Sequence, residues 1–141
     1  MSEEKSRVVE QASFPVSADR LWELVSDFGG IAKYMDGVDE CHLVGEGVGA
    51  RRSIPGAAGT VVEALDQFDP DARTLVYSII EGPIPFKDYS AQMVVSEDGP
   101  EASTLTWTGT FLADGTPVDK AERFASRIYQ GGIAGYRKAL S

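Results

Sequence analysis

The chain has 141 residues, 43% of them hydrophobic, which is the usual size of one globular domain and enough to bury a core. Its 13 basic and 22 acidic residues give a formal charge of −9, which argues against binding nucleic acid or an anionic membrane through a broad basic surface. The single cysteine excludes an internal disulfide, and with the single histidine it cannot assemble a metal-ligand cluster. We therefore expect no metal and no other cofactor, and a reducing environment.

The distribution of apolar residues limits membrane association and domain number. The first six residues are polar, without the apolar segment of a secretory signal, and no apolar run approaches the roughly 18 residues of a membrane-spanning helix. Neither internal repeats nor low-complexity tracts are visible. We expect one domain over residues 1–141, with residues 1–5 flexible, no stable membrane insertion and a cytoplasmic location.

A strand and two short helices are predicted at the start of the chain. Residues 7–14 alternate, and one face of this strand holds Val8, Glu10, Ala12 and Phe14. After Pro15, Ser17 is a suitable N-cap for a helix with apolar residues at i, i+3, i+4 and i+7, namely Leu21, Leu24, Val25 and Phe28. Gly29-Gly30 is expected to close this helix, and residues 31–35 to form one further short turn.

From Val38 onward the pattern changes from helical to alternating, with turn sequences between the runs. The expected strands are Val38–Val44, Ala50–Ile54, Thr60–Phe68, Arg73–Ile80, Lys87–Val95 and Ser103–Leu112. With the first strand they make a seven-stranded antiparallel sheet. Since one long helix cannot cover a flat sheet of this width, we expect an α+β fold whose sheet curves around the C-terminal helix and encloses a cavity.

The last stretch, Thr116–Leu140, is predicted to be that long helix, with Thr116 as N-cap and Pro117 at the first helical position. Its expected inner face is Ala121, Phe124, Ala125, Ile128, Gly131 or Gly132, Gly135 and Ala139. Three interior glycines cost roughly 3 kcal/mol of helix stability. Either the helix kinks or ends near Gln130, or the glycines permit close approach of the sheet or a ligand. On the ligand interpretation, they border the roomiest part of the cavity.

One face of the later strands carries large apolar residues, and we take this face as the inner one. Its aromatic residues are Tyr77, Tyr89, Trp107 and Phe111. Glu63 is a carboxylate on this apolar face and needs a partner, for which Arg52 is the natural candidate. Unpaired in an apolar pocket, Glu63 could transfer a proton near neutral pH. An ordinary salt bridge, or a Glu63 that points outward at a strand end, is the alternative.

Other chemically distinctive residues favour structural roles. His42 has no nucleophile at an interpretable spacing and is expected to be an exposed strand residue. Cys41 is expected to be a small buried hydrophobe. The glycine-rich run at residues 45–49 has no following helix to bind phosphate and is predicted to be a hairpin turn. Residues 82–86 form either a gate over the cavity or a rigid connection.

Four segments together resemble a known family. They are LWELVSDFGGIAKYM, GVGARRSI, VVEALDQFDPDARTLVYSIIEGPIPFKDYSAQM and LTWTGTF, with the order of elements around them. The chain resembles the polyketide cyclase/dehydrase and lipid-transport superfamily, also called START-like, Bet v 1-like or SRPBCC. That resemblance covers nearly the whole chain and implies a helix-grip fold, in which a seven-stranded sheet curves around a C-terminal helix and encloses an apolar ligand cavity.

Within the superfamily, residues 63–107 resemble plant lachrymatory-factor synthase. This likeness implies catalytic roles for Arg52 and Glu63 and places pocket aromatic residues near Tyr89 and Trp107. From the inner faces of the sheet and of the last helix, the expected ligand-binding residues are Tyr77, Ile79, Ala91, Met93, Trp107, Phe111, Phe124, Ile128, Gly131 and Gly132.

Three functions follow. The first is binding of a hydrophobic small molecule such as a lipid, isoprenoid or polyketide-like aromatic. The second is a cofactor-independent cyclase, dehydratase or isomerase in which Glu63 moves a proton, Arg52 stabilises an oxyanion and Tyr89 orients the substrate. The third, an interaction partner of another protein, has weak support because no large exposed apolar stripe is evident.

Overall fold

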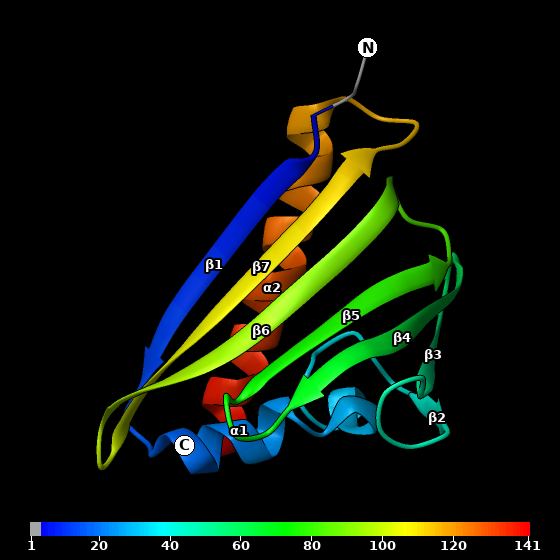
Figure 1. Ribbon diagram of the computed structural model, residues 1–141. Coiled ribbons are helices and arrows are strands. Elements are labelled where there is room, and N and C mark those ends of the chain that lie inside the picture. The colour runs from blue at the N-terminus through cyan, green and yellow to red at the C-terminus, as the bar shows by residue number, and fades with distance from the viewer. Residues whose placement is uncertain (1–3) are drawn as a thin grey trace.

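A computed structural model of the chain describes residues 4–141. Residues 1–3, for which the sequence predicts flexibility as part of residues 1–5, therefore lie outside the described residues. In chain order the elements are β1 (Ser6–Phe14), α1 (Ala18–Val25), the 3-10 helix η1 (Phe28–Lys33), β2 (His42–Val44), β3 (Arg51–Gly56), β4 (Gly59–Asp69), β5 (Thr74–Glu81), β6 (Phe86–Gly99), β7 (Ala102–Ala113) and α2 (Val118–Leu140) (Figure 1).

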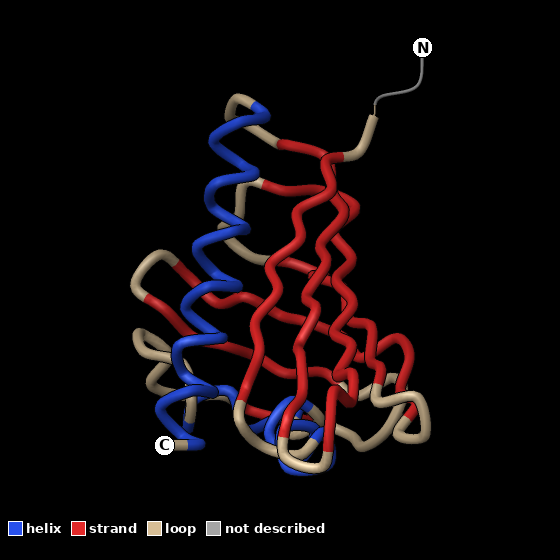
Figure 2. Tube along the Cα trace, turned by 90° about the vertical axis from the view of Figure 1, so that its left-hand side faces the viewer, coloured by secondary structure: helices blue, strands red, loops and turns tan. Residues whose placement is uncertain are grey.

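The strands form one seven-stranded antiparallel sheet in the order β1-β7-β6-β5-β4-β3-β2. Figure 2 shows α2 standing along one face of the sheet, with α1 and η1 gathered at the end near the C-terminus. The core lies between these helices and the inner face of the sheet. The α+β fold expected from the alternating pattern, and the helix-grip fold that the family resemblance implies, are therefore confirmed.

The prediction for the second strand is wrong in its first half, because β2 includes only His42–Val44. Its partner β3 reaches it only at Arg51, Arg52 and Ser53, and the rest of β3 pairs with β4 alone. Alternation of side chains favours a strand, but an edge strand also needs a neighbour to accept its hydrogen bonds. Residues 38–41 do not pair with the continuation of β3 and form a loop.

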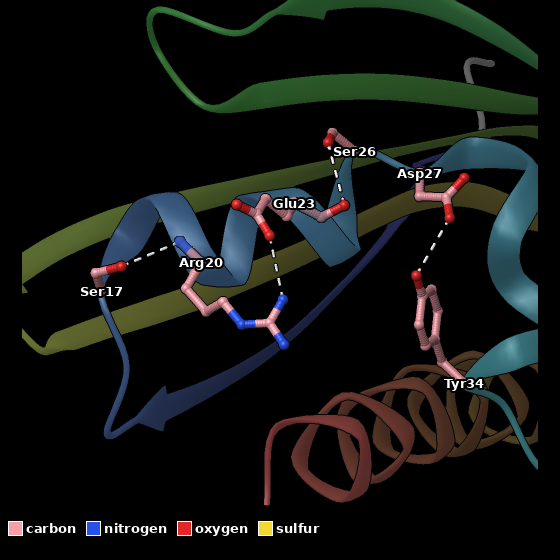
Figure 3. Close-up of polar contacts among 6 residues, drawn as sticks. All are labelled: Ser17, Arg20, Glu23, Ser26, Asp27 and Tyr34. Carbon is pink, nitrogen blue, oxygen red and sulfur yellow. Dashed lines mark hydrogen bonds and ion pairs between the residues drawn. The ribbon is translucent and has the colours of Figure 1, made fainter.

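Ser17 caps α1 as predicted, since its hydroxyl accepts a hydrogen bond from the backbone N of Arg20 at 3.1 Å (Figure 3). Gly29-Gly30 does not close α1, however, and instead lies inside η1. A Cβ on Gly30 would overlap the carboxylate of Asp27, so a larger residue here would have to displace that side chain. The same carboxylate accepts a hydrogen bond from the Tyr34 hydroxyl at 3.2 Å (Figure 3).

Helix α2 is continuous to Leu140, so the alternative of an end near Gln130 is wrong. The predicted cap is wrong by one residue. Pro117, not Thr116, is the N-cap, because its carbonyl accepts hydrogen bonds from the backbone N of Lys120 and of Ala121, both at 3.1 Å. No side chain caps this end of the helix.

The buried face of α2 is rotated relative to the predicted one. Its residues are Ala121, Ala125, Tyr129, Gly132, Ile133, Gly135 and Tyr136. Phe124 is 45% exposed, Ile128 is half-buried and Gly131 is exposed. Two rows of apolar residues overlap in this sequence, and the row with larger side chains, which includes two tyrosines, faces the sheet.

The glycines of α2 serve close packing. A Cβ on Gly132 would lie 2.5 Å from Cζ3 of Trp107, and one on Gly135 would overlap the backbone carbonyl oxygen of Tyr34. Gly131 has only the Cε of Met35 nearby, at 3.8 Å. The expectation that these glycines border the roomiest part of a cavity is therefore wrong, because the indole ring and the segment after η1 lie directly against the helix.

Candidate functional site

An ion pair lies on the inner face of the sheet. The register of β3 and β4 places Arg52 directly opposite Glu63, and Nε of Arg52 donates to Oε1 of Glu63 at 2.7 Å. Both residues are buried, with exposed fractions of 6% and 8%. The inward orientation of Glu63 and its pairing with Arg52 are confirmed, and an outward-pointing Glu63 is excluded.

The guanidinium group of Arg52 has further contacts. Its Nη1 donates to the carbonyl oxygen of Phe28 at 2.9 Å, and its Cζ lies 4.0 Å from the ring centroid of Phe28 and 5.0 Å from that of Tyr77. Burial is the largest single influence and lowers the pKa of Arg52, but the charge and hydrogen bond of Glu63 together with Tyr77 and Tyr136 outweigh it, so the pKa is raised overall. Arg52 is therefore a fixed cation, and these two hydrogen bonds leave its Nη2 available.

A small chamber adjoins this pair. It has a volume of about 10 Å³ and is lined by Arg52, Tyr77, Trp107 and Tyr136 together with side chains of η1 and its surroundings. This volume holds about one water molecule. Aromatic side chains fill the rest of the interior, so the roomy cavity that the sequence predicts is reduced to this chamber.

A set of buried hydroxyl groups crosses the interior from the sheet to α2. The indole N–H of Trp107 donates to the hydroxyl of Tyr77 at 3.2 Å. The hydroxyls of Tyr89 and Tyr129 are hydrogen-bonded to each other. Gly109 on β7 makes room for this bond, because a Cβ there would overlap the Tyr129 hydroxyl.

These phenols are neutral donors. Burial raises the pKa of Tyr77 and of Tyr89 well above the ordinary value, and it raises the pKa of Tyr129 as well. Burial likewise raises the pKa of Tyr136 to about 12. The interior therefore offers hydroxyl hydrogens, one guanidinium group and one carboxylate within an otherwise aromatic and aliphatic environment.

The sequence profile of the family described as polyketide cyclase / dehydrase and lipid transport matches residues 5–141. The chain belongs to this family. The comparison with curated proteins found no significant match.

Several solved structures have a fold similar to that of this polyketide cyclase/dehydrase family member, and the similarity covers almost its whole chain. The protein XoxI from Bacillus cereus is 23% identical, with a TM-score of 0.87 over 95% of this chain and 94% of its own. The Zhui aromatase/cyclase from a Streptomyces species is 18% identical, with a TM-score of 0.74 over 96% and 91% of the two chains.

A third similar structure is a point mutant of Thalictrum flavum norcoclaurine synthase in complex with a transition-state analogue. It is 14% identical, with a TM-score of 0.78 over 99% and 96% of the two chains. At these identities the likeness shows the helix-grip fold. Among residues 4–141, no helix is long and apolar enough to cross a membrane.

The candidate ligand-binding residues of this family member separate into two groups. The interior group is Tyr77, Ala91, Met93, Trp107, Phe111 and Gly132, which are buried around the chamber and the hydroxyl groups. Ile79 and Ile128 are half-buried, and Phe124 and Gly131 are exposed on the side of α2. The structure thus places the second group at the periphery of the interior, where Phe124 contacts the ring of Phe86 at a centroid distance of 5.7 Å.

Sequence reasoning missed Tyr129, Tyr136 and Phe28. The first two follow Ala125 at spacings of four and eleven residues, which is helical spacing, so a second apolar row was readable in the sequence. Phe28 was assigned to a helix face, but its carbonyl oxygen and ring both contact Arg52. No local pattern indicates that contact, because it joins residues 24 positions apart.

The remaining distinctive residues lie away from the chamber. His42 is exposed, as predicted, with its Nε2 3.6 Å from Oε2 of Glu40. Cys41 is half-buried, which corrects the expectation of a buried hydrophobe, because it lies in the loop before the edge strand β2. Residues 45–49 connect β2 to β3, as the predicted hairpin turn requires.

Proposed function

We propose that the protein binds a hydrophobic small molecule, such as a lipid, an isoprenoid or a polyketide-like aromatic, between the sheet and α2. The observation that carries this proposal is the buried Arg52–Glu63 pair beside a chamber in an aromatic interior. Ligand sites of this kind are mostly apolar, with a few polar groups that fix the ligand's orientation. Arg52 supplies such a group.

Energetics favour a role in binding over a role in stability for this pair. Desolvating two charges costs several kcal/mol per ion, and well-packed apolar residues commonly serve equally well or better. A fold that needed only stability would gain little from a charge pair here. In the proposed complex, Nη2 of Arg52 and the hydroxyl of Tyr136 donate hydrogen bonds to an acceptor oxygen of the ligand.

Room for the apolar part of the ligand requires side chains to move, because the chamber of about 10 Å³ holds no more than a water molecule. Met93 lines the chamber, and a thioether side chain adapts its shape at little cost. The partly exposed side chains of Ile79, Ile128 and Phe124 extend this apolar surface outward. Ligand binding would remove them from water, which supplies the driving force.

The test uses a matched pair of fluorescent probes, 6-acetyl-2-dimethylaminonaphthalene and its 6-ethyl analogue, which lacks the acceptor oxygen. We expect the ketone to bind about tenfold or more tightly than the ethyl analogue, because a hydrogen bond to a charged group contributes about 1.5–3 kcal/mol. The double variant Arg52→Met with Glu63→Leu should lose the preference for the ketone but keep its affinity for the ethyl analogue.

The matched control is Asp19→Leu with Arg73→Met, which removes a surface ion pair of 2.8 Å between Asp19 and Arg73. This control should keep the preference for the ketone. Equal binding of both probes by the unmodified protein would reject Arg52 as the polar anchor. If neither probe bound to the unmodified protein or to any of its variants, the binding proposal itself would be rejected.

A second candidate function is a cofactor-independent cyclase, dehydratase or isomerase at the same place. The observation in its favour is that a carboxylate, Glu63, is buried and hydrogen-bonded through Oε1 to Arg52, which lines the chamber. Glu63 would take a proton from the carbon next to a carbonyl group, and Arg52 would stabilise the enolate oxygen that forms. Tyr89 would orient the substrate.

This second function is tested by hydrogen–deuterium exchange at the acetyl methyl group of the ketone probe in deuterated water. Catalysed exchange that Glu63→Gln abolishes, with probe affinity retained, supports proton transfer by Glu63. Exchange at the rate of the buffer alone would leave a binding protein without this chemistry.

A further inference from the structure

The strands β5 and β6 separate before they reach the loop that joins them. They pair only between Thr74–Ser78 and Ser90–Val94, although β5 continues to Glu81 and β6 begins at Phe86. Figure 1 shows the two strands diverging toward this loop. By contrast, β1 pairs with β7 without interruption along its whole length, from Ser6 to Phe14.

Local sequence features hold the two strands apart. The pairing of β6 with β7 is irregular between Lys87 and Ser90, which places a bulge there. Asp88, within the bulge, has a φ of 53° in the left-handed region. The connecting loop contains Pro83 and Pro85, which lack the N–H group that a continued ladder would need.

A hollow of about 440 Å³ occupies the gap between the strands. Its outer edge includes Ile80, which is 44% exposed. Its floor includes Phe86 and Tyr89, which are buried inner-face residues whose rings stack at a centroid distance of 5.2 Å. Since Tyr89 also bonds Tyr129 of α2, the lining of the hollow includes a side chain that belongs to the interior.

We propose that the ligand enters and leaves the interior through this gap between β5 and β6. This inference rests on the proposed binding function. Passage here requires rotation of the Phe86 and Tyr89 side chains, whereas passage between paired strands would break backbone hydrogen bonds worth about 1 kcal/mol each. The C-terminal half of α2 gives no alternative, because Tyr34 and Trp107 lie against Gly135 and Gly132.

The size of the hollow fits this role. Sites for drug-sized ligands have volumes of about 300–1,000 Å³, and the hollow of about 440 Å³ lies within that range. The other side of the same aromatic floor is covered by Phe124 of α2, whose ring packs on Phe86. A ring-containing ligand can therefore reach the interior from the sheet side without displacing the helix.

The experiment measures binding and release of 6-acetyl-2-dimethylaminonaphthalene by stopped-flow fluorescence. Ile80→Trp should obstruct the gap and slow association and dissociation by the same factor, about tenfold, with an unchanged Kd, because it raises only the barrier. Ile80→Ala should accelerate both rates. The matched control is Val9→Trp, at a 41% exposed position on the outer face of β1, which should change neither rate.

Thermal unfolding verifies that all three variants are folded. Unchanged rates in Ile80→Trp, with probe affinity intact, would overturn the passage while the binding function stands. A change in Kd without a common change in both rates would also overturn it, because Ile80 would then contact the bound ligand. If the unmodified protein fails to bind the probe, the binding function is rejected, and the passage with it.

Discussion

Replacing the glycines of α2 with alanine one at a time should give opposite effects at neighbouring positions. Gly131→Ala should stabilise the protein, because its new Cβ meets only the Cε of Met35 at 3.8 Å, an ordinary van der Waals contact. Alanine in a helix interior is favoured over glycine by about 1 kcal/mol. For a domain of this size, that gain corresponds to a rise in Tm of about 4 °C.

Gly132→Ala and Gly135→Ala have the same gain in helix propensity but should destabilise the protein. At Gly132 the Cβ would lie 2.5 and 2.8 Å from two ring carbons of Trp107. That ring cannot move away, since it stacks on Tyr129 at 4.7 Å and donates to Tyr77. Overpacking costs about 1–3 kcal/mol, so after the gain of about 1 kcal/mol in helix propensity the net loss should be up to about 2 kcal/mol.

At Gly135 the obstacle is the backbone carbonyl of Tyr34, which has no rotamer to change. Urea unfolding of the three variants should therefore show a higher midpoint for Gly131→Ala and lower midpoints for the other two, with unchanged m values. A stabilising effect at Gly135, or equal effects at all three positions, would refute the close packing of η1 and the sheet against this helix.

Three more predictions concern the interior. Arg52→Met or Glu63→Leu alone should lower the free energy of unfolding in urea by about 3–5 kcal/mol, because each leaves an unpaired buried charge, whereas the double variant should recover most of this loss. A double variant as unstable as either single variant would contradict this prediction. Gly109→Ala should lower the free energy of unfolding by about 1–3 kcal/mol, because its methyl group overlaps the Tyr129 hydroxyl, and adding Tyr129→Phe should restore part of that loss. Strictly additive effects in this double-mutant cycle would argue against the contact. Burial raises the pKa of Tyr136 from 10.0 to about 12, so the unfolded chain releases this proton at lower pH than the folded protein does. The contribution of the Tyr136 hydroxyl to the free energy of unfolding is complete below about pH 10, and the free energy of unfolding falls by on the order of 3 kcal/mol as the pH rises through 12. Tyr136→Phe should therefore flatten the alkaline part of a plot of unfolding free energy against pH.

The strands were predictable because alternation is a local property of extended chain. Side chains of a strand point to opposite faces in turn, so the sequence alone places Tyr77 and Tyr89 on the same side as Glu63. An acidic residue on that apolar face required a partner, and Arg52 on the preceding strand was the available one. The fold could therefore be inferred from the sequence, and Arg52 could be named as the candidate partner of Glu63, while the outward-pointing alternative stayed open.

The rotation of α2 could not be inferred in the same way. The sequence carries two overlapping rows of apolar residues, one with Phe124 and Ile128 and the other with Tyr129 and Ile133. Both have helical spacing, so periodicity does not choose between them. The choice depends on Gly109, which leaves space on β7 for the Tyr129 hydroxyl, and that complementarity joins residues 20 positions apart in the sequence.

The sequence by itself determined the order of elements and the inner face of the sheet, and it identified Arg52 as the candidate partner of Glu63, because these depend on backbone periodicity and on the cost of burying charge. Only the tertiary structure decided how much space remains inside. The space beside Gly132 and Gly135 of α2 is filled by Trp107 and by the backbone of Tyr34, and a hollow lies instead between β5 and β6. Free volume is what remains after all elements have packed together, so no single stretch of sequence encodes it.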